Sequence, residues 1–217
     1  MLFIPYNKNR QIVSLASGRS QDKLPLAWQW NHNPDHNLWS VDARPGYLRL
    51  TTGRVDTDVL NAKNMLTQRT FGPESSATIA METDQMKDGD YAGFIALQKL
   101  YGFVGVKKEG NRKSIVMTAQ KDKAPAEYIE IPFDKSRVYF RIDCDYNPEN
   151  EQQRKDKAYF YYSLDGEKWE RMGEPLQMRY TLPHFMGYRF GLFNFATKSM
   201  GGFVDFDYFR VTDKINY

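Results

Sequence analysis

The sequence of 217 residues has one cysteine, Cys144, so no disulfide bond can form within the chain. Cys144 shares the apolar register of Phe140 and Ile142, a position typical of a small buried hydrophobic side chain rather than of a reactive thiol. One buried thiol is compatible with a reducing or an oxidising compartment.

Long apolar runs are also missing. No run approaches the length of a membrane-spanning helix. The apolar start, residues 1–5, is too short for a signal peptide and lacks its basic flank and cleavage signature. Charge is nearly balanced, with 30 basic and 27 acidic residues. We therefore expect neither nucleic acid nor a membrane as partner.

The motifs of common catalytic centres are absent as well. The three histidines do not show zinc-site spacing, and there is no Gly-x-Ser-x-Gly elbow for a serine nucleophile. Residues 82–87 come nearest to the Glu-x-Asp-x-x-Glu pattern of sandwich glucanases but lack the last acid. Asp205 and Asp207 also have no third acid beside them. We expect no catalysis by this chain alone.

The chain is rich in aromatic residues, with 14 Tyr, 14 Phe and 4 Trp, which favours strands over helices. Many segments alternate polar and apolar residues, and turn residues such as Asp165-Gly166 separate them. The expected strands include 47–52, 76–83, 92–100, 137–146, 159–164, 189–197 and 203–211. This pattern predicts an all-β sandwich or jelly roll. We expect a lead-in or linker over residues 1–23 and one domain over 24–217.

The segment Trp-Gln-Trp-Asn-His-Asn-Pro at 28–34 admits two interpretations. On an extended strand Trp28 and Trp30 project to the same face, where they belong to a sandwich core. Alternatively, Trp30 stacks on a sugar ring while Asn31 and His32 meet its hydroxyl groups. His32 is equally well explained as a solvent-facing loop residue.

Polar residues interrupt several expected strands. Gln68 and Arg69 are adjacent, so one of them faces inward or into a groove. Gln98 and Asn194 share strand faces with apolar residues. A buried amide or guanidinium is costly unless it is paired or used. Such residues suit either a sugar-binding face or a structural polar groove.

Asp205 and Asp207 lie on the last expected strand and are candidate ligands for a structural calcium ion, because sandwich domains often fix their termini in this way. We favour the alternative, an exposed acidic face. No cofactor is expected to be required.

Several motifs together resemble the C-terminal sandwich domain of glycoside hydrolase family 43 enzymes, over residues 24–212. In chain order they are Trp-Gln-Trp-Asn-His-Asn-Pro at 28–34, Arg-Pro-Gly-Tyr-Leu-Arg-Leu at 44–50, Asn-Met-Leu-Thr-Gln-Arg at 64–69, Gly-Pro at 72–73, Ala-Gly-Phe at 92–94, Tyr-Gly-Phe-Val-Gly-Val at 101–106, Tyr-Ser-Leu-Asp-Gly at 162–166 and Gly-Phe-Val-Asp-Phe-Asp-Tyr-Phe-Arg-Val at 202–211.

The resemblance implies a concanavalin A-like jelly roll of two antiparallel sheets. It implies substrates of the xylan and arabinoxylan class, and parent enzymes that are β-xylosidases or α-L-arabinofuranosidases with their catalytic carboxylates in a preceding propeller. We expect a secreted or periplasmic bacterial parent protein. The resemblance also implies a loop near 182–187 that completes the catalytic pocket, with Phe185 as the candidate aromatic residue.

Three functions follow as hypotheses. The first is a non-catalytic module that binds xylan or xylo-oligosaccharides in one shallow trough. The second is a structural domain that braces the propeller and has no sugar affinity of its own. The third is a self-sufficient sandwich glycosidase. The residues expected to line the trough are Trp30, Asn31, His32, Gln68, Arg69, Gln98, Tyr101 and Asn194.

Overall fold

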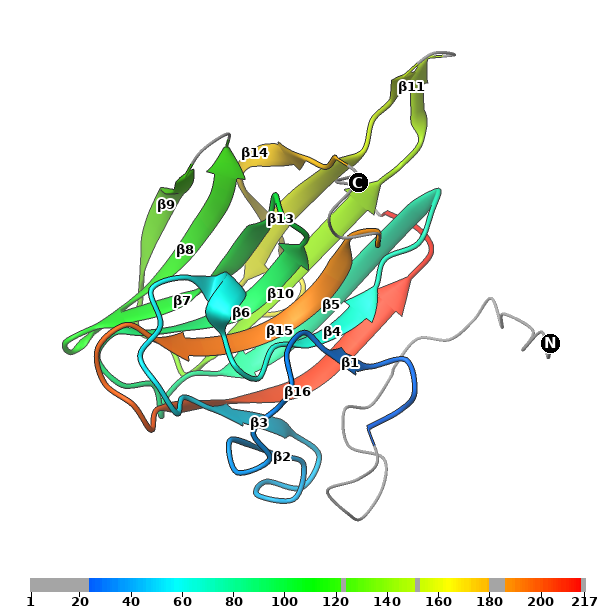
Figure 1. Cartoon of the computed structure of the whole chain (residues 1–217). Coiled ribbons are helices and arrows are strands. Elements are labelled where there is room, and N and C mark those ends of the chain that lie inside the picture. The colour runs from blue at the N-terminus through cyan, green and yellow to red at the C-terminus, as the bar shows by residue number, and fades with distance from the viewer. Residues whose placement is uncertain (1–23, 122–123, 151–152, 180–185, 216–217) are drawn as a thin grey trace.

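A computed structural model describes residues 24–121, 124–150, 153–179 and 186–215. Two antiparallel sheets of seven strands each lie face to face (Figure 1), so the predicted all-β sandwich is confirmed. The expected lead-in, 1–23, lies outside the described residues. The part of the chain that the structure describes contains no helix long and apolar enough to cross a membrane.

We call the two sheets sheet I and sheet II. In spatial order, sheet I contains β1 (Gln29–Trp30), β4 (Leu66–Arg69), β15 (Arg189–Ala196), β6 (Asp90–Leu97), β7 (Gly102–Glu109), β8 (Arg112–Lys121) and β9 (Ala124–Phe133). Sheet II contains β14 (Glu170–Gln177), β13 (Lys157–Ser163), β10 (Arg137–Asp145), β5 (Glu74–Glu82), β16 (Phe203–Thr212), β3 (Leu48–Thr51) and β2 (Trp39–Ser40). A small hairpin of β11 (Pro148–Asn150) and β12 (Gln153–Arg154) stands apart from both.

The main core fills the space between the sheets, because alternate residues of every strand point inward. Aromatic rings meet there edge to face. The ring centroids of Trp28 and Phe209 are 4.8 Å apart, and those of Phe94 and Phe209 are 6.0 Å apart. Cys144 is fully buried in this core, as predicted. Burial raises the pKa of its thiol, so the group stays protonated.

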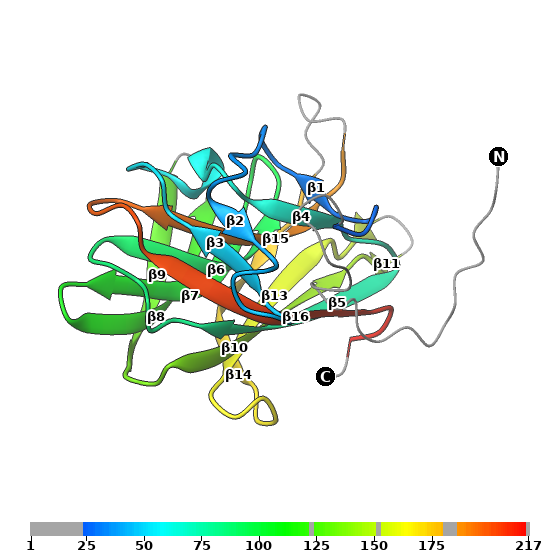
Figure 2. The ribbon, with the colours of Figure 1, turned by 90° about the horizontal axis from the view of Figure 1, so that it is seen from below.

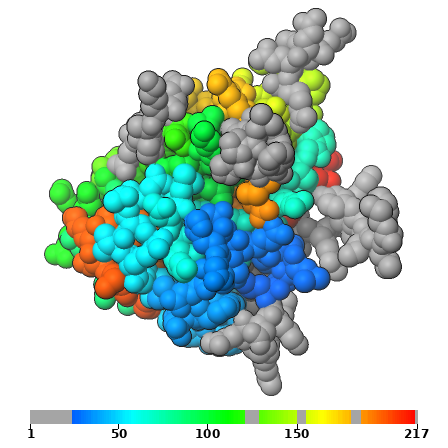
Figure 3. Space-filling view, in the orientation of Figure 1, coloured from blue at the N-terminus to red at the C-terminus, as the bar shows by residue number. Residues whose placement is uncertain are grey.

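A second core covers the outer face of sheet I. The segment around the 3₁₀ helix η1 (Val59–Asn61) folds over this face, and Val59, Ala62 and Met65 pack with outward-facing residues of sheet I such as Phe103 and Phe193. Figure 2 shows the cyan η1 above β15 and β6, with sheet II on the far side. In Figure 3 the cyan atoms of this region hide the strands behind them. Both faces of sheet I are therefore largely covered.

Candidate functional site

The outer face of sheet II carries a groove that follows the central strand β5. The outward side chains of β5 are small: Ser76, Thr78 and Ala80. Longer side chains stand on the neighbours β10 and β16, where Tyr139 and Tyr208 both pair in register with Ala80. The large side chains of β10 and β16 stand above the small ones of β5 and line a depression on this face, which we call the β5 groove.

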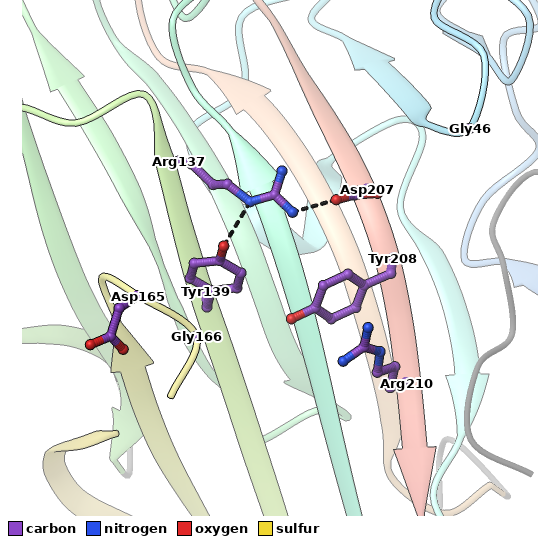
Figure 4. A pocket seen from close by; sticks show the side chains of 8 residues that line it. All are labelled: Gly46, Arg137, Tyr139, Asp165, Gly166, Asp207, Tyr208 and Arg210. Carbon is purple, nitrogen blue, oxygen red and sulfur yellow. Dashed lines mark hydrogen bonds and ion pairs between the residues drawn. The ribbon is translucent and has the colours of Figure 1, made fainter. Parts of the chain in front are cut away.

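One end of the β5 groove widens into a pocket of about 490 Å³. This volume lies in the range of ligand-binding pockets. Figure 4 shows Tyr139 and Tyr208 beside each other across β5, with Arg137 above them and Arg210 below Tyr208. The lining residues are Gly46, Arg137, Tyr139, Asp165, Gly166, Asp207, Tyr208 and Arg210.

Arg137 fixes the upper wall of the pocket through three hydrogen bonds. Its guanidinium donates to Glu82 Oε1 at 2.8 Å, to the carboxylate of Asp207, and through Nε to the hydroxyl oxygen of Tyr139 at 3.0 Å. Burial is the largest single influence on the pKa of Arg137 and lowers it, but the hydrogen bond and charge of Asp207, together with smaller effects of Tyr139 and Tyr47, raise the pKa above its ordinary value. The wall is thus preorganised, with its ring and its charges held in place.

The turn between β13 and β14 closes the opposite side. The Asp165 carboxylate accepts backbone N–H groups of Glu167 and Lys168, both at 2.8 Å. These bonds lower the pKa of Asp165 to about 2. Gly166 adopts φ +81°, which favours glycine, and a Cβ there would lie 3.2 Å from the Tyr139 ring. The chain turns at Asp165-Gly166 as predicted, but the loop between β13 and β14 has six residues, 164–169, rather than two, and it borders the pocket.

Arginine and aromatic side chains alternate along the rest of this face. The Arg210 guanidinium lies 4.1 Å from the Tyr208 ring centre, and that of Arg141 lies 4.2 Å from Tyr161 and 5.0 Å from Trp169. The ring faces suit the C–H surface of a sugar, while guanidinium and carboxylate groups suit its hydroxyls.

Asp205 and Asp207 do not fit a calcium site. Both are on the outer side of β16, but the Arg49 fork holds Asp205 with bonds of 2.7 and 2.8 Å, and Arg137 holds Asp207. Within the described ranges, no group of three or more His, Cys, Asp or Glu side chains is placed to hold a metal ion. The two carboxylates are partners of arginines, and Asp205 is only 5% exposed.

The trough expected from the sequence does not form, and that expectation is wrong. Asn194 is 6% exposed and points between the sheets, where its Nδ2 donates to Leu50 O at 2.9 Å. Tyr101 is 2% exposed in the second core, and its hydroxyl donates to Asp58 Oδ2 at 3.2 Å.

Gln68 and Gln98 are also buried. Gln98 Nε2 donates to Met186 O at 3.0 Å. Gln68 pairs in register with the core residue Phe190 and therefore points toward the other sheet. Gln68 therefore belongs to the space between the sheets, whereas Gln98 also lines a pocket of about 270 Å³ beside Tyr146 and Tyr188, which none of the other expected trough residues lines.

The other expected residues lie near β1 and β4, away from the β5 groove. Trp30 is half-buried, with its ring 5.1 Å from Trp39. The exposed ring of His32 forms a hydrogen bond of 2.7 Å with Leu60 O, and Asn31 lies 3.3 Å from the same ring. Arg69 is exposed at the end of β4. Phe185 lies outside the described residues.

Sequence reasoning missed Tyr139, Tyr208 and Arg137 as site residues. A signal was present: on 137–145 the outward series of Arg, Tyr, Arg, Asp and Asp contains no aliphatic residue. That series indicates an uncovered strand face with rings and charges on it.

The fold and this face define an antiparallel β-sandwich with one polar, ring-bearing outer side. The model of the family described as the beta xylosidase C-terminal concanavalin A-like domain matches residues 20–212, and the chain belongs to this family. It is the non-catalytic domain of family 43 proteins, whose catalytic propeller is a separate domain not contained in these 217 residues.

Related sequences and solved structures support the same family assignment. A beta-xylosidase of Formosa agariphila is 27% identical over 88% of this chain and 33% of its own. A bifunctional GH43-CE structure of Bacteroides eggerthii is 52% identical, with a TM-score of 0.85 over 91% of this chain and 25% of that one. An engineered GH43 hydrolase with endo-xylanase and exo-arabinofuranosidase activity is 30% identical, with a TM-score of 0.85 over 97% of this chain and 42% of that one. The chain thus spans about a third of its first curated relative.

Proposed function

We propose that this domain is a carbohydrate-binding accessory module, and that the β5 groove binds chains of the xylan class beside a family 43 catalytic domain. The observation that carries the proposal is the pair Tyr139 and Tyr208, held over small floor residues and next to the hydrogen-bonded Arg137. This pair offers two adjoining ring faces, with fixed polar groups beside them, on the lining of an open pocket. The xylan class is supported by the names of the relatives.

Binding by such a groove is expected to be weak. Sugar hydroxyls exchange hydrogen bonds with water for hydrogen bonds with protein, and the net gain per bond is only about 1 kcal/mol. Most selectivity then comes from the spacing of the two rings and of the polar groups around them.

The alternative bracing function receives less support from the surface. A domain that only braces a propeller is expected to carry a broad apolar docking face. Among the described residues the large exposed hydrophobic side chains are four, on four different segments: Leu26, Val55, Leu164 and Met200.

The glycosidase alternative is also disfavoured. Two carboxylates of that hypothesis, Glu82 and Asp207, both bind Arg137. Both carboxylates accept hydrogen bonds from that guanidinium, so they are engaged within the protein rather than free to flank a glycosidic bond.

Calorimetric titration with xylohexaose tests the proposal. Wild-type domain is expected to bind, and the double variant Tyr139→Ala/Tyr208→Ala is expected to lose detectable binding. Tyr91→Ala is the matched control, because Tyr91 is a half-buried tyrosine of sheet I outside the groove. Absence of heat with the wild type, or equal binding by the double variant, would overturn the proposal. Restored activity when the domain is added to a truncated catalytic partner, without sugar binding, would favour bracing.

A further inference from the structure

Two arginines stand side by side on the outer face of sheet I, on the opposite side of the sandwich from the β5 groove. Arg69 of β4 and Arg189 of β15 are register partners on adjacent antiparallel strands (Figure 1). Register partners in such a pair have Cβ atoms about 5 Å apart, so the two guanidinium groups share one patch of surface.

Neither arginine has a carboxylate partner among the described residues. Among the residues that the structure describes, no carboxylate lies within 4 Å of either guanidinium. Arg189 Nη1 donates to Thr67 Oγ1 at 3.1 Å, while Arg189 Nε is buried without an acceptor. Burial and the charge of Arg69 lower the pKa of Arg189. The described neighbours of half-buried Arg189 therefore offset its positive charge only in part.

The half-buried arginines of sheet II show what is missing. Arg49 binds Asp205, Arg137 binds Asp207, and Arg141 lies 3.3 Å from Asp143. Each has a carboxylate of this chain. Like charges placed directly opposite on neighbouring strands destabilise a sheet, and within the described part of the chain the pair Arg69 and Arg189 has no anion to offset that cost.

We propose that Arg69 and Arg189 form a binding site for a carboxylate, supplied by a uronic acid residue of the polysaccharide. The choice of a uronic acid as the source rests on the proposed function, whereas the carboxylate site itself does not. Planar guanidinium forks bind carboxylates through two parallel N–H···O bonds, which favours this anion over a spherical one. Gln29, exposed and paired in register with Thr67, places an amide beside the site for sugar hydroxyls.

The test is an NMR titration of the ¹⁵N-labelled domain with sodium glucuronate, at an ionic strength held constant with sodium chloride. Glucuronate is expected to shift the amide signals around Thr67, Arg69 and Arg189, and glucose, which lacks the carboxylate, is not. Arg69→Gln and Arg189→Gln are each expected to weaken glucuronate binding about tenfold or more. Arg112→Gln, at the exposed tip of the β7–β8 hairpin, is the matched control and is expected to bind like the wild type.

Three outcomes would overturn the proposal: equal responses to glucuronate and glucose, wild-type affinity in both variants, or binding of inorganic sulfate without binding of glucuronate. Arg69→Gln removes only an exposed charge, so its fold is secure even if Arg189→Gln does not fold. If xylohexaose did not bind the β5 groove, the proposed function would be wrong but the carboxylate site would not be affected. The two results can be told apart because xylohexaose and glucuronate are expected to shift the amide signals of different residues.

Discussion

The rings of Tyr139 and Tyr208 lie 6.5 Å apart, although their strands β10 and β16 are not neighbours. They approach across Ala80, whose side chain is too small to separate them. Their planes meet at 36°, which leaves a shallow angled surface rather than a flat one. A ligand in the β5 groove would meet both rings at once.

The first prediction concerns what Tyr208 contributes. Tyr208→Ala is expected to weaken xylohexaose binding roughly fivefold to tenfold, because one aromatic contact is worth about 1 kcal/mol. Tyr208→Phe keeps the ring face and is expected to retain most of the affinity. Isothermal titration calorimetry measures both. Equal losses in the two variants would show that the hydroxyl, not the ring, is used.

The second prediction separates stability from binding at Asn194. Asn194→Ala removes the hydrogen bond to Leu50 O between the sheets, so the free energy of unfolding is expected to fall by about 1–3 kcal/mol. Urea denaturation measures this change. Affinity for xylohexaose is expected to be unaltered in the folded variant. A selective loss of affinity with unchanged stability would return Asn194 to the candidate site.

The third prediction concerns divalent ions. Since the carboxylates of Asp205 and Asp207 are held by arginines, the melting temperature is expected to be the same in EDTA and in millimolar calcium chloride. Asp205→Asn is expected to cost about 1–3 kcal/mol, because it leaves the partly buried Arg49 without its bidentate partner. Scanning calorimetry reports both. A calcium-dependent rise in melting temperature that Asp205→Asn abolishes would contradict this account.

The fourth prediction concerns pH. Asp90 is fully buried at the start of β6, and burial raises the pKa of its carboxyl from 3.8 to about 6. The folded state therefore holds the proton more tightly than the unfolded state, and the free energy of unfolding is expected to fall as pH rises from about 4 to 6. The change is of the order of 2–3 kcal/mol.

Asp90→Asn is expected to remove this part of the pH dependence in urea denaturation between pH 4 and 7. Asp134→Asn, at an exposed loop carboxyl, is the control and is expected to keep the wild-type slope. An unchanged slope in Asp90→Asn would mean that another group carries the effect.

The sequence was a good guide to the fold and a poor guide to the site. Alternating strands, turn residues such as Asp165-Gly166 and the ordered motifs predicted two antiparallel sheets, because period and turn chemistry are local properties. Alternation does not say which face of a strand is covered. In sheet I both faces are largely covered, so Tyr101 and Asn194 looked like surface groups but are buried and structural.

The β5 groove depends on three strands that are distant in sequence. Tyr139, Ala80 and Tyr208 become neighbours only through the register of β10, β5 and β16. No local pattern contains that register. The alternating residues of 137–145 marked an open face, but not the partner strands that complete it.

The segment around η1 determines what happens when this domain partly unfolds. It seals Phe103, Phe193 and other apolar residues, and the bond between Tyr101 and Asp58 secures it. If it detached, the apolar outer face of sheet I would be exposed to solvent, and copies of the domain would associate through it. Damage there would be detected first as self-association in light scattering, with the outer face of sheet II still intact.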